Sequence, residues 1–148
     1  MADFNSPGSI ARSVAKSEIE SLFHRYAVLA KETATPDKMA QVFHPDGVFR
    51  LPNGVAVKPA DLLTVVQGNN PKFIRHHITS IDIEFVSPDE AHTEAFYLAV
   101  TNLSSPDHWG CWKDVVTKGQ DGKWLIFDRT VVVDGGDPKG WFKATYPG

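Results

Sequence analysis

The sequence predicts an α+β fold, because two kinds of pattern occupy the two halves of the chain. Apolar residues recur at helical spacing only before residue 68, and four longer stretches typical of strands follow. Short turns with the sequences SPDE, LSSPD and GQDG separate these strands, which are therefore expected to pair antiparallel. We expect helices packed on one face of a curved antiparallel or mixed sheet, which wraps as a cone around a long N-terminal helix and encloses a pocket. The expected strands are 73–86, 91–103, 109–118 and 123–134.

A capping signal indicates where the long N-terminal helix begins. Ser17 and Glu20 form an S-x-x-E capping box, and the apolar residues that follow have helical spacing up to about Glu32. Residues 1–12 are polar and contain Gly, Ser and Pro, so they are expected to form a flexible arm. The single folded domain is then expected to span residues 13–134.

Shorter elements are expected between the long helix and the long strands. Thr35 and Pro36 are typical of an N-cap and first helical position, and the HPDG sequence at 44–47 should end that second helix after Phe43. Residues 48–57 predict a hairpin around an Asn-Gly turn. A third helix is expected at 59–68, closed by its final glycine.

Composition and charge exclude several classes of function. The chain has 148 residues, of which 42% are apolar and 22% charged, as is usual for one globular domain. A net charge of −3 without a Lys/Arg run argues against binding to nucleic acid or to an anionic membrane. The one cysteine, Cys111, excludes an internal disulfide, and no stretch has the roughly 18 apolar residues of a membrane span. The expected location is the cytoplasm.

Five short motifs, in this order and spacing, carry a resemblance to a known family. They are RYA (25–27), VFHPDGVF (42–49), RHHITS (75–80), GCWKD (110–114) and DGKWLIFDR (121–129). With them the chain resembles the SnoaL-like, scytalone dehydratase-like group of the nuclear transport factor two-like superfamily. The resemblance implies a cone of the cystatin-like α+β barrel type. It also implies a dehydratase, isomerase or cyclase that needs no cofactor and acts on a small hydrophobic ring compound, such as a polyketide, terpenoid, steroid or aromatic intermediate.

The resemblance also implies site residues. A pocket histidine that acts as general base and acid falls on His76, and a tyrosine on the first helix falls on Tyr26, where its hydroxyl could polarise a substrate oxygen. An acidic position falls on Glu32, which is a third candidate. The position for a second polar group, on the next strand, falls on 99–101 and offers only the hydroxyl of Thr101. This departure favours the alternative reading, a non-catalytic module that binds a small ligand or forms oligomers.

Two adjacent histidines leave a conflict over which of them faces the pocket. Regular alternation along the strand puts His77 on the same face as Ile81 and Phe85, whereas the resemblance selects His76. One β-bulge between residues 77 and 81 would reconcile the two, and we expect His76 to face inward on that condition.

Further residues are expected to contact a ligand or to support the site. Asp114 needs a partner if it is buried, and Arg129 on the last strand could supply one as a structural ion pair. No histidine spacing suggests a metal site, and no cofactor is expected. The candidate substrate-binding residues are His77, Phe23, Thr101, Cys111, Trp112, Asp114 and Arg129.

The C-terminal tail and the quaternary structure give two more expectations. Residues 135–148 contain Trp141, Phe142 and Tyr146 among Gly and Pro, so we expect an extended segment over apolar surface. It could close the pocket mouth, cross to a partner subunit or pad the outside of the core, and among the functional roles we favour the lid. The resemblance implies a homodimer through the outer face of the sheet, to which Val115 and 131–133 would contribute.

Overall fold

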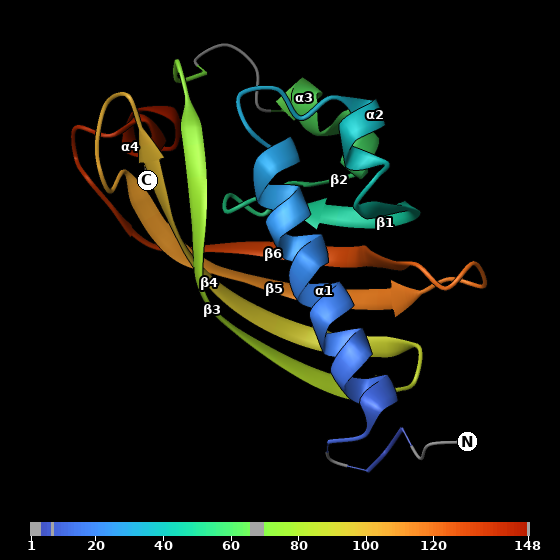
Figure 1. Cartoon of the computed structure of the whole chain (residues 1–148). Coiled ribbons are helices and arrows are strands. Elements are labelled where there is room, and N and C mark those ends of the chain that lie inside the picture. Colours follow the sequence, from blue (N-terminus) through green and yellow to red (C-terminus); the bar gives the residue numbers. More distant parts are fainter. Residues whose placement is uncertain (1–3, 7, 66–69, 148) are drawn as a thin grey trace.

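The predicted fold class is confirmed by the computed structural model, which describes residues 4–6, 8–65 and 70–147. One curved sheet has the strand order β2-β1-β6-β5-β4-β3, in which β1 runs parallel to β6 and the other neighbours are antiparallel. The long helix α1 lies across the concave face of this sheet (Figure 1). The helices are α1 (Ile10–Leu29), α2 (Pro36–Met39), α3 (Leu62–Val65) and α4 (Trp141–Thr145), with a 3₁₀ turn at Pro59–Asp61. The strands are β1 (Phe43–Arg50), β2 (Ala56–Val57), β3 (Ile74–Ser87), β4 (Glu90–Thr101), β5 (His108–Lys118) and β6 (Trp124–Gly136).

Helix α1 begins earlier than the capping box predicts. The hydroxyl of Ser9 accepts a hydrogen bond from the backbone N–H of Arg12, so Ser9 is the N-cap and Ser17 lies within the helix. The predicted start at Ser17 is therefore wrong, because a local side-chain cap is already available upstream. The helix also ends at Leu29, before the expected Glu32. Its buried face is Ala15, Ile19, Leu22, Phe23 and Tyr26.

The region between α1 and the long strands differs from its prediction at the second helix, which ends at Met39 and not after Phe43. Strand β1 starts at Phe43, so the HPDG sequence belongs to a strand and not to a helix end. Pairing with β6 is the reason: Phe43 lies opposite Ile126, and an irregularity of register before Val48 accommodates the intervening residues. The hairpin turn is as predicted, with Gly54 at φ +84°. The predicted end of the third helix, 66–68, lies outside the described residues.

The four long strands are confirmed, and β3 contains the bulge that the two histidines require. Ile78 pairs with Tyr97 and Ser80 with Phe96, which leaves Thr79 as an extra residue in β3. The parity of the inward face changes there. His76 consequently lies on the concave side of the sheet together with Ile81 and Ile83, and His77 lies on the other side.

The core lies between α1 and the concave face of the sheet. Phe23, Phe43 and Trp112 are each no more than 1% exposed, and Arg129 is fully buried among them. The sheet extends beyond α1, so other segments, among them α4, cover one end of the cone. None of the helices in the described residues is long and apolar enough to cross a membrane.

The C-terminal segment ends in a short helix, so the predicted extended conformation is wrong for Trp141–Thr145. Gly140 is the N-cap, and the backbone N–H groups of Trp141 and Phe142 donate to the carboxylate of Asp107. A carboxylate at the first turn satisfies N–H groups that would otherwise lack partners. The cap comes from a residue distant in sequence, which local propensity does not reveal.

Candidate active site

A cavity of about 130 Å³ occupies the open end of the cone. Helix α1, strands β1, β3, β5 and β6, and helix α4 all contribute to its wall. The wall is mainly apolar, with Phe49, Leu51, Leu62, Ile74, Trp112 and Val131 among its residues. A cavity of this kind, with few polar groups, is typical of sites for small organic ligands.

His76 is one of those polar groups, and it faces the cavity as expected. Its ring packs edge-on against Tyr97 and tilted against Trp112, with centroid distances of 5.5 Å in both cases. Burial is the main cause that lowers the pKa of His76 to about 3, and the nearby His108 and Arg129 contribute to the same shift. The imidazole is therefore neutral at pH 7. Its Nδ1 is buried without a hydrogen-bond partner among the described residues.

A second imidazole, His108, lies on the same wall and was not among the expected site residues. His76 pairs with Ala99 across β3 and β4, and Ala99 pairs with His108 across β4 and β5. The methyl group of Ala99 leaves room above it, and the two imidazole centroids are 6.0 Å apart. The second polar group that seemed absent from 99–101 is thus supplied from one strand further on. An Asp-His pair at the start of a strand was its only sequence signal.

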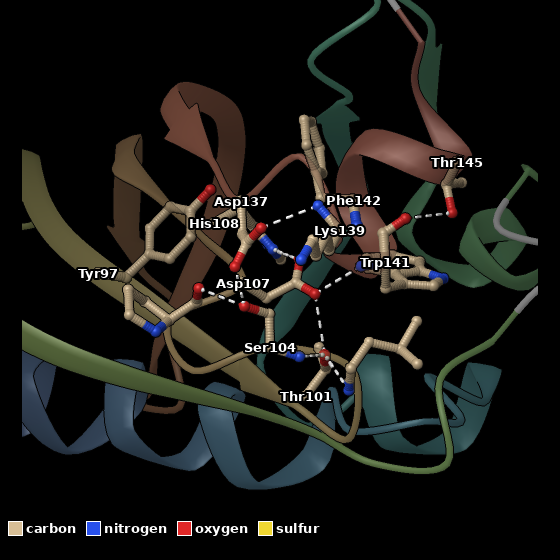
Figure 2. Close-up of polar contacts among 12 residues, drawn as sticks. Tyr97, Thr101, Ser104, Asp107, His108, Asp137, Lys139, Trp141, Phe142 and Thr145 are labelled. Atoms are coloured by element: carbon tan, nitrogen blue, oxygen red, sulfur yellow. Dashed lines mark hydrogen bonds and ion pairs between the residues drawn. The ribbon is translucent and has the colours of Figure 1, made fainter.

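The carboxylate of Asp107 fixes the orientation of His108. His108 Nδ1 is 2.8 Å from Asp107 Oδ1, and both side chains are buried. The same carboxylate accepts from the Thr101 hydroxyl at 2.8 Å, the Trp141 N–H at 2.6 Å and the Phe142 N–H at 3.1 Å. Figure 2 shows these contacts converging on Asp107. Burial lowers the pKa of His108, while the carboxylate of Asp107 opposes that change.

Tyr26 reaches the cavity from α1, on the opposite side from the sheet. The side chain is 4% exposed, and its ring packs edge-on against Trp112 at 5.0 Å. Burial raises the pKa of the Tyr26 hydroxyl, although the positive charge of Arg129 lowers it in part. The hydroxyl therefore stays protonated and able to donate a hydrogen bond at neutral pH.

The expected ion pair between Asp114 and Arg129 is present beneath the cavity. Arg129 Nε lies 2.9 Å from Asp114 Oδ1, and Nη2 lies 2.6 Å from Oδ2, with both side chains fully buried. The guanidinium carbon is 4.0 Å from the ring centre of Tyr26 and 4.3 Å from that of Trp112. The cation is thus held between two aromatic faces and paired in a bidentate manner.

Glu32 lies at the rim of the cavity and not in its interior. Its carboxylate accepts from the backbone N–H of Ile74 at 2.9 Å and forms an ion pair with Arg75. Burial opposes ionisation of Glu32, but the hydrogen bond from Arg75, the backbone hydrogen bonds and the charge of Arg75 together outweigh it, and the pKa falls to about 2. Glu32 is therefore an ionised rim group that ties the end of α1 to the start of β3.

The structure places the remaining expected residues as follows. Trp112 lines the cavity, whereas Asp114 and Arg129 lie below its wall. Cys111 is on the other face of β5 from Trp112, and burial raises the pKa of its thiol. The others that do not line the cavity are His77, Phe23 and Thr101.

The C-terminal aromatic residues do belong to the cavity. Trp141, Phe142 and Tyr146 all line it, and the ring of Phe142 stacks on that of His108 at 4.9 Å. Helix α4 therefore forms part of the wall near the two histidines. Within the described residues, no three His, Cys, Asp or Glu side chains are close enough to share a metal ion.

Comparison with solved structures gives the same fold. A candidate scytalone dehydratase of Novosphingobium aromaticivorans DSM 12444 has 23% identity and a TM-score of 0.71, over 86% of this chain and 89% of that chain. The hexachlorocyclohexane dehydrochlorinase LinA-type3 of Novosphingobium barchaimii LL02 has 16% identity and a TM-score of 0.73, over 86% and 92%. ActVI-ORFA of Streptomyces coelicolor has 21% identity and a TM-score of 0.67, over 82% and 98%. At these identities the likeness is one of fold.

No curated protein matches the chain. The model of one family, described as the SnoaL-like domain, matches residues 11–130. That range runs from the start of α1 into β6 and includes His76, Tyr26 and the Asp107–His108 pair. The resemblance found in the five motifs is thereby confirmed, and the chain belongs to the SnoaL-like domain family.

Proposed function

We propose that the protein is a cofactor-independent lyase or isomerase that moves a proton on a small, largely apolar, oxygenated ring compound. The observation that carries the proposal is the cavity itself, in which His76 from β3 and Tyr26 from α1 enter an otherwise apolar space. A polyketide, terpenoid, steroid or aromatic intermediate has the matching chemistry. The neighbours include proteins named as a candidate scytalone dehydratase and as a dehydrochlorinase, both eliminations, which supports this class.

The proposed acid/base centre is built on His76, with Tyr26 as hydrogen-bond donor. A neutral imidazole has a lone pair for a proton, and a protonated phenol can stabilise negative charge on a substrate oxygen. The mainly apolar wall favours an uncharged substrate, because burying an unpaired charge is costly. Glu32 would hold the rim of the cavity in place through its contacts with Ile74 and Arg75. Helix α4 would act as a lid that keeps water out of the cavity.

Proton exchange with heavy water tests the proposal without knowledge of the natural substrate. The protein is incubated in D₂O with 2-tetralone, a bicyclic ketone with acidic C–H groups, and deuterium uptake is followed by NMR. We expect faster uptake than in buffer, and a loss of about 10² to 10⁴-fold in His76→Ala, the range for one acid/base group. His77→Ala is the matched control, since His77 lies on the other face of the same strand.

Three outcomes would change this proposal. Uptake no faster than in buffer, for 2-tetralone and for smaller cyclic ketones, would overturn the proposal. If 7-hydroxycoumarin nevertheless bound in the cavity, the protein would be a binding module of the same fold. Equal losses in His76→Ala and His77→Ala would remove His76 from the centre.

We also propose a homodimer through the outer face of the sheet. Phe96, Trp109 and Phe127 are 51%, 40% and 38% exposed there, which is typical of an apolar surface that a partner covers. Of the valines expected on that face, Val131 and Val133 instead line the cavity, because alternate residues of β6 point to opposite faces of the sheet. Sedimentation at micromolar concentration tests the proposal, and a monomer would refute it.

A further inference from the structure

The proposed function places the acid/base centre at His76, but His108 lines the same cavity and is a second candidate for the group that takes the substrate proton. Resting on the proposed lyase or isomerase but revising its proton acceptor, we propose that Nε2 of His108 takes the proton in place of His76, with Asp107 as its positioning residue, and that His76 stays neutral throughout. The carboxylate of Asp107 also caps α4, so the same group fixes both the acceptor and the lid.

The hydrogen bonds around Asp107 determine the tautomer of His108. The three other partners of the carboxylate, the Thr101 hydroxyl and the N–H groups of Trp141 and Phe142, all donate. A carboxylate that accepts from every side is ionised, so the proton between it and His108 belongs to Nδ1. Neutral His108 therefore carries its lone pair on Nε2, which has no hydrogen bond within the described residues, and the side chain lines the cavity.

Charge favours His108 over His76 as the group that becomes positive. None of the other three partners of Asp107 carries a charge, so an imidazolium at His108 would be the first cation to pair with that buried carboxylate. In the part of the chain that the structure describes, no carboxylate pairs with His76. Its ring contacts are Tyr97, Trp112 and His108, and the cation Arg129 is near enough to oppose its protonation.

The arrangement allows a balanced reaction within one cavity. Nε2 of His108 takes a proton from a carbon beside a carbonyl, and the C–H electron pair moves toward the carbonyl oxygen, where the Tyr26 hydroxyl donates a hydrogen bond. In an isomerisation, Nε2 returns that proton to a different carbon. In a dehydration, the electron pair forms a C=C bond, hydroxide leaves the neighbouring carbon with its bonding pair, and the proton on Nε2 converts it to water. No other reactant is consumed.

Helix α4 is coupled to this step through the shared carboxylate. When α4 lies on the cavity wall, its first two N–H groups hold Asp107 against His108 and the ring of Phe142 stacks on the imidazole. If α4 moved away, the carboxylate would lose two of its four donors. Closure of the cavity and the correct tautomer of His108 are therefore expected to occur together.

The test combines deuterium uptake with a direct view of the imidazole. We expect His108→Gln to lower uptake by 2-tetralone about 10²-fold or more. In ¹⁵N-labelled protein, the long-range ¹H–¹⁵N spectrum should show His108 as the Nδ1–H tautomer, and Asp107→Asn should shift it toward a mixture and lower uptake. Asp137→Asn is the matched control, because Asp137 contacts Ser104 and Lys139 but not His108.

The outcomes separate this inference from the proposed function. Fast uptake in the wild type that His76→Ala abolishes and His108→Gln leaves unchanged would refute the role of His108 and keep the lyase or isomerase. An Nε2–H tautomer in the wild type, or one that Asp107→Asn does not change, would refute the role of Asp107. Slow uptake in the wild type would instead refute the proposed function. The long-range ¹H–¹⁵N spectrum would still show whether Asp107 determines the tautomer of His108.

Discussion

Asp114 and Asp107 are both buried next to the cavity, but different groups hold their charges. Asp114 faces the guanidinium of Arg129 in a bidentate pair, so its charge is neutralised where it stands. The carboxylate of Asp107 instead has hydrogen bonds with a hydroxyl, two backbone N–H groups and an imidazole. Burial raises the pKa of Asp114 despite Arg129, whereas for Asp107 the donated hydrogen bonds outweigh burial and lower the pKa.

The difference indicates which aspartate can take part in chemistry. The charge of a carboxylate that is paired with a fixed cation is already neutralised, so it cannot stabilise a second positive group. Removing that carboxylate leaves the cation buried without a partner. A carboxylate held by neutral donors keeps its negative charge available to a neighbour that gains a proton, here His108. Asp114 is therefore expected to matter first for stability, and Asp107 first for the function of the cavity.

The largest expected effect comes from breaking the Asp114 pair. Asp114→Asn should lower the free energy of unfolding by about 3–5 kcal/mol, because Arg129 would stay buried without its counter-charge. Urea denaturation measures it. The exposed pair of Arg50 and Asp128 provides the control, since Asp128→Asn should cost only about 0–1 kcal/mol. Equal losses in the two variants would contradict the difference between buried and exposed pairs.

A smaller effect on stability, confined to α4, is expected from Asp107→Asn. Loss of a helix-capping carboxylate costs about 0.5–2 kcal/mol. Amide hydrogen exchange at Trp141 and Phe142 should therefore quicken by about 2- to 30-fold, while exchange in α1 changes little. Asp137→Asn should leave both regions unchanged. If α4 exchanged at the wild-type rate in Asp107→Asn, the carboxylate would not be what fixes the helix.

The smallest effect is expected for a third carboxylate, Glu32, which meets its cation at the rim. Its pKa is about 2 in the folded protein against an ordinary 4.5, so the folded state binds the proton less readily than the unfolded state. The resulting stabilisation is present above pH 4.5 and is lost as the pH falls from 4.5 toward 2. At a partly exposed pair it amounts to less than about 1 kcal/mol.

The melting temperatures of the wild type and Glu32→Gln test this sign. The wild type should melt higher at pH 7, and the two curves should converge near pH 2. A gap that stayed constant down to pH 2 would mean that Glu32 acts through packing and not through its charge.

The parts of the fold that sequence could predict are those with local signals. The four long strands follow from apolar and β-branched runs with turns between them, and the Asp114–Arg129 pair follows from the need of each buried charge for a partner. The bulge in β3 could be stated only as a condition, because no single residue type encodes it. Its presence at Thr79 came from the pairing of β3 with β4.

The parts that sequence could not predict depend on contacts between distant residues. His108 becomes a neighbour of His76 only through two successive strand pairings across Ala99, whereas the position expected for a second polar group was one strand nearer. Helix α4 owes its first turn to Asp107, which is 34 residues away from Trp141. The Gly and Pro residues around it gave the opposite local indication.

The bulge at Thr79 also determines how the cavity wall would respond to changes in chain length. Deleting Thr79 would make the pairing of β3 and β4 regular and keep His76 on the inner face. If the chain kept its length and the start of β3 slipped by one residue, His77 would take the place of His76. Either change presents an imidazole to the cavity, so the adjacent histidines make this wall tolerant of a one-residue deletion or register slip.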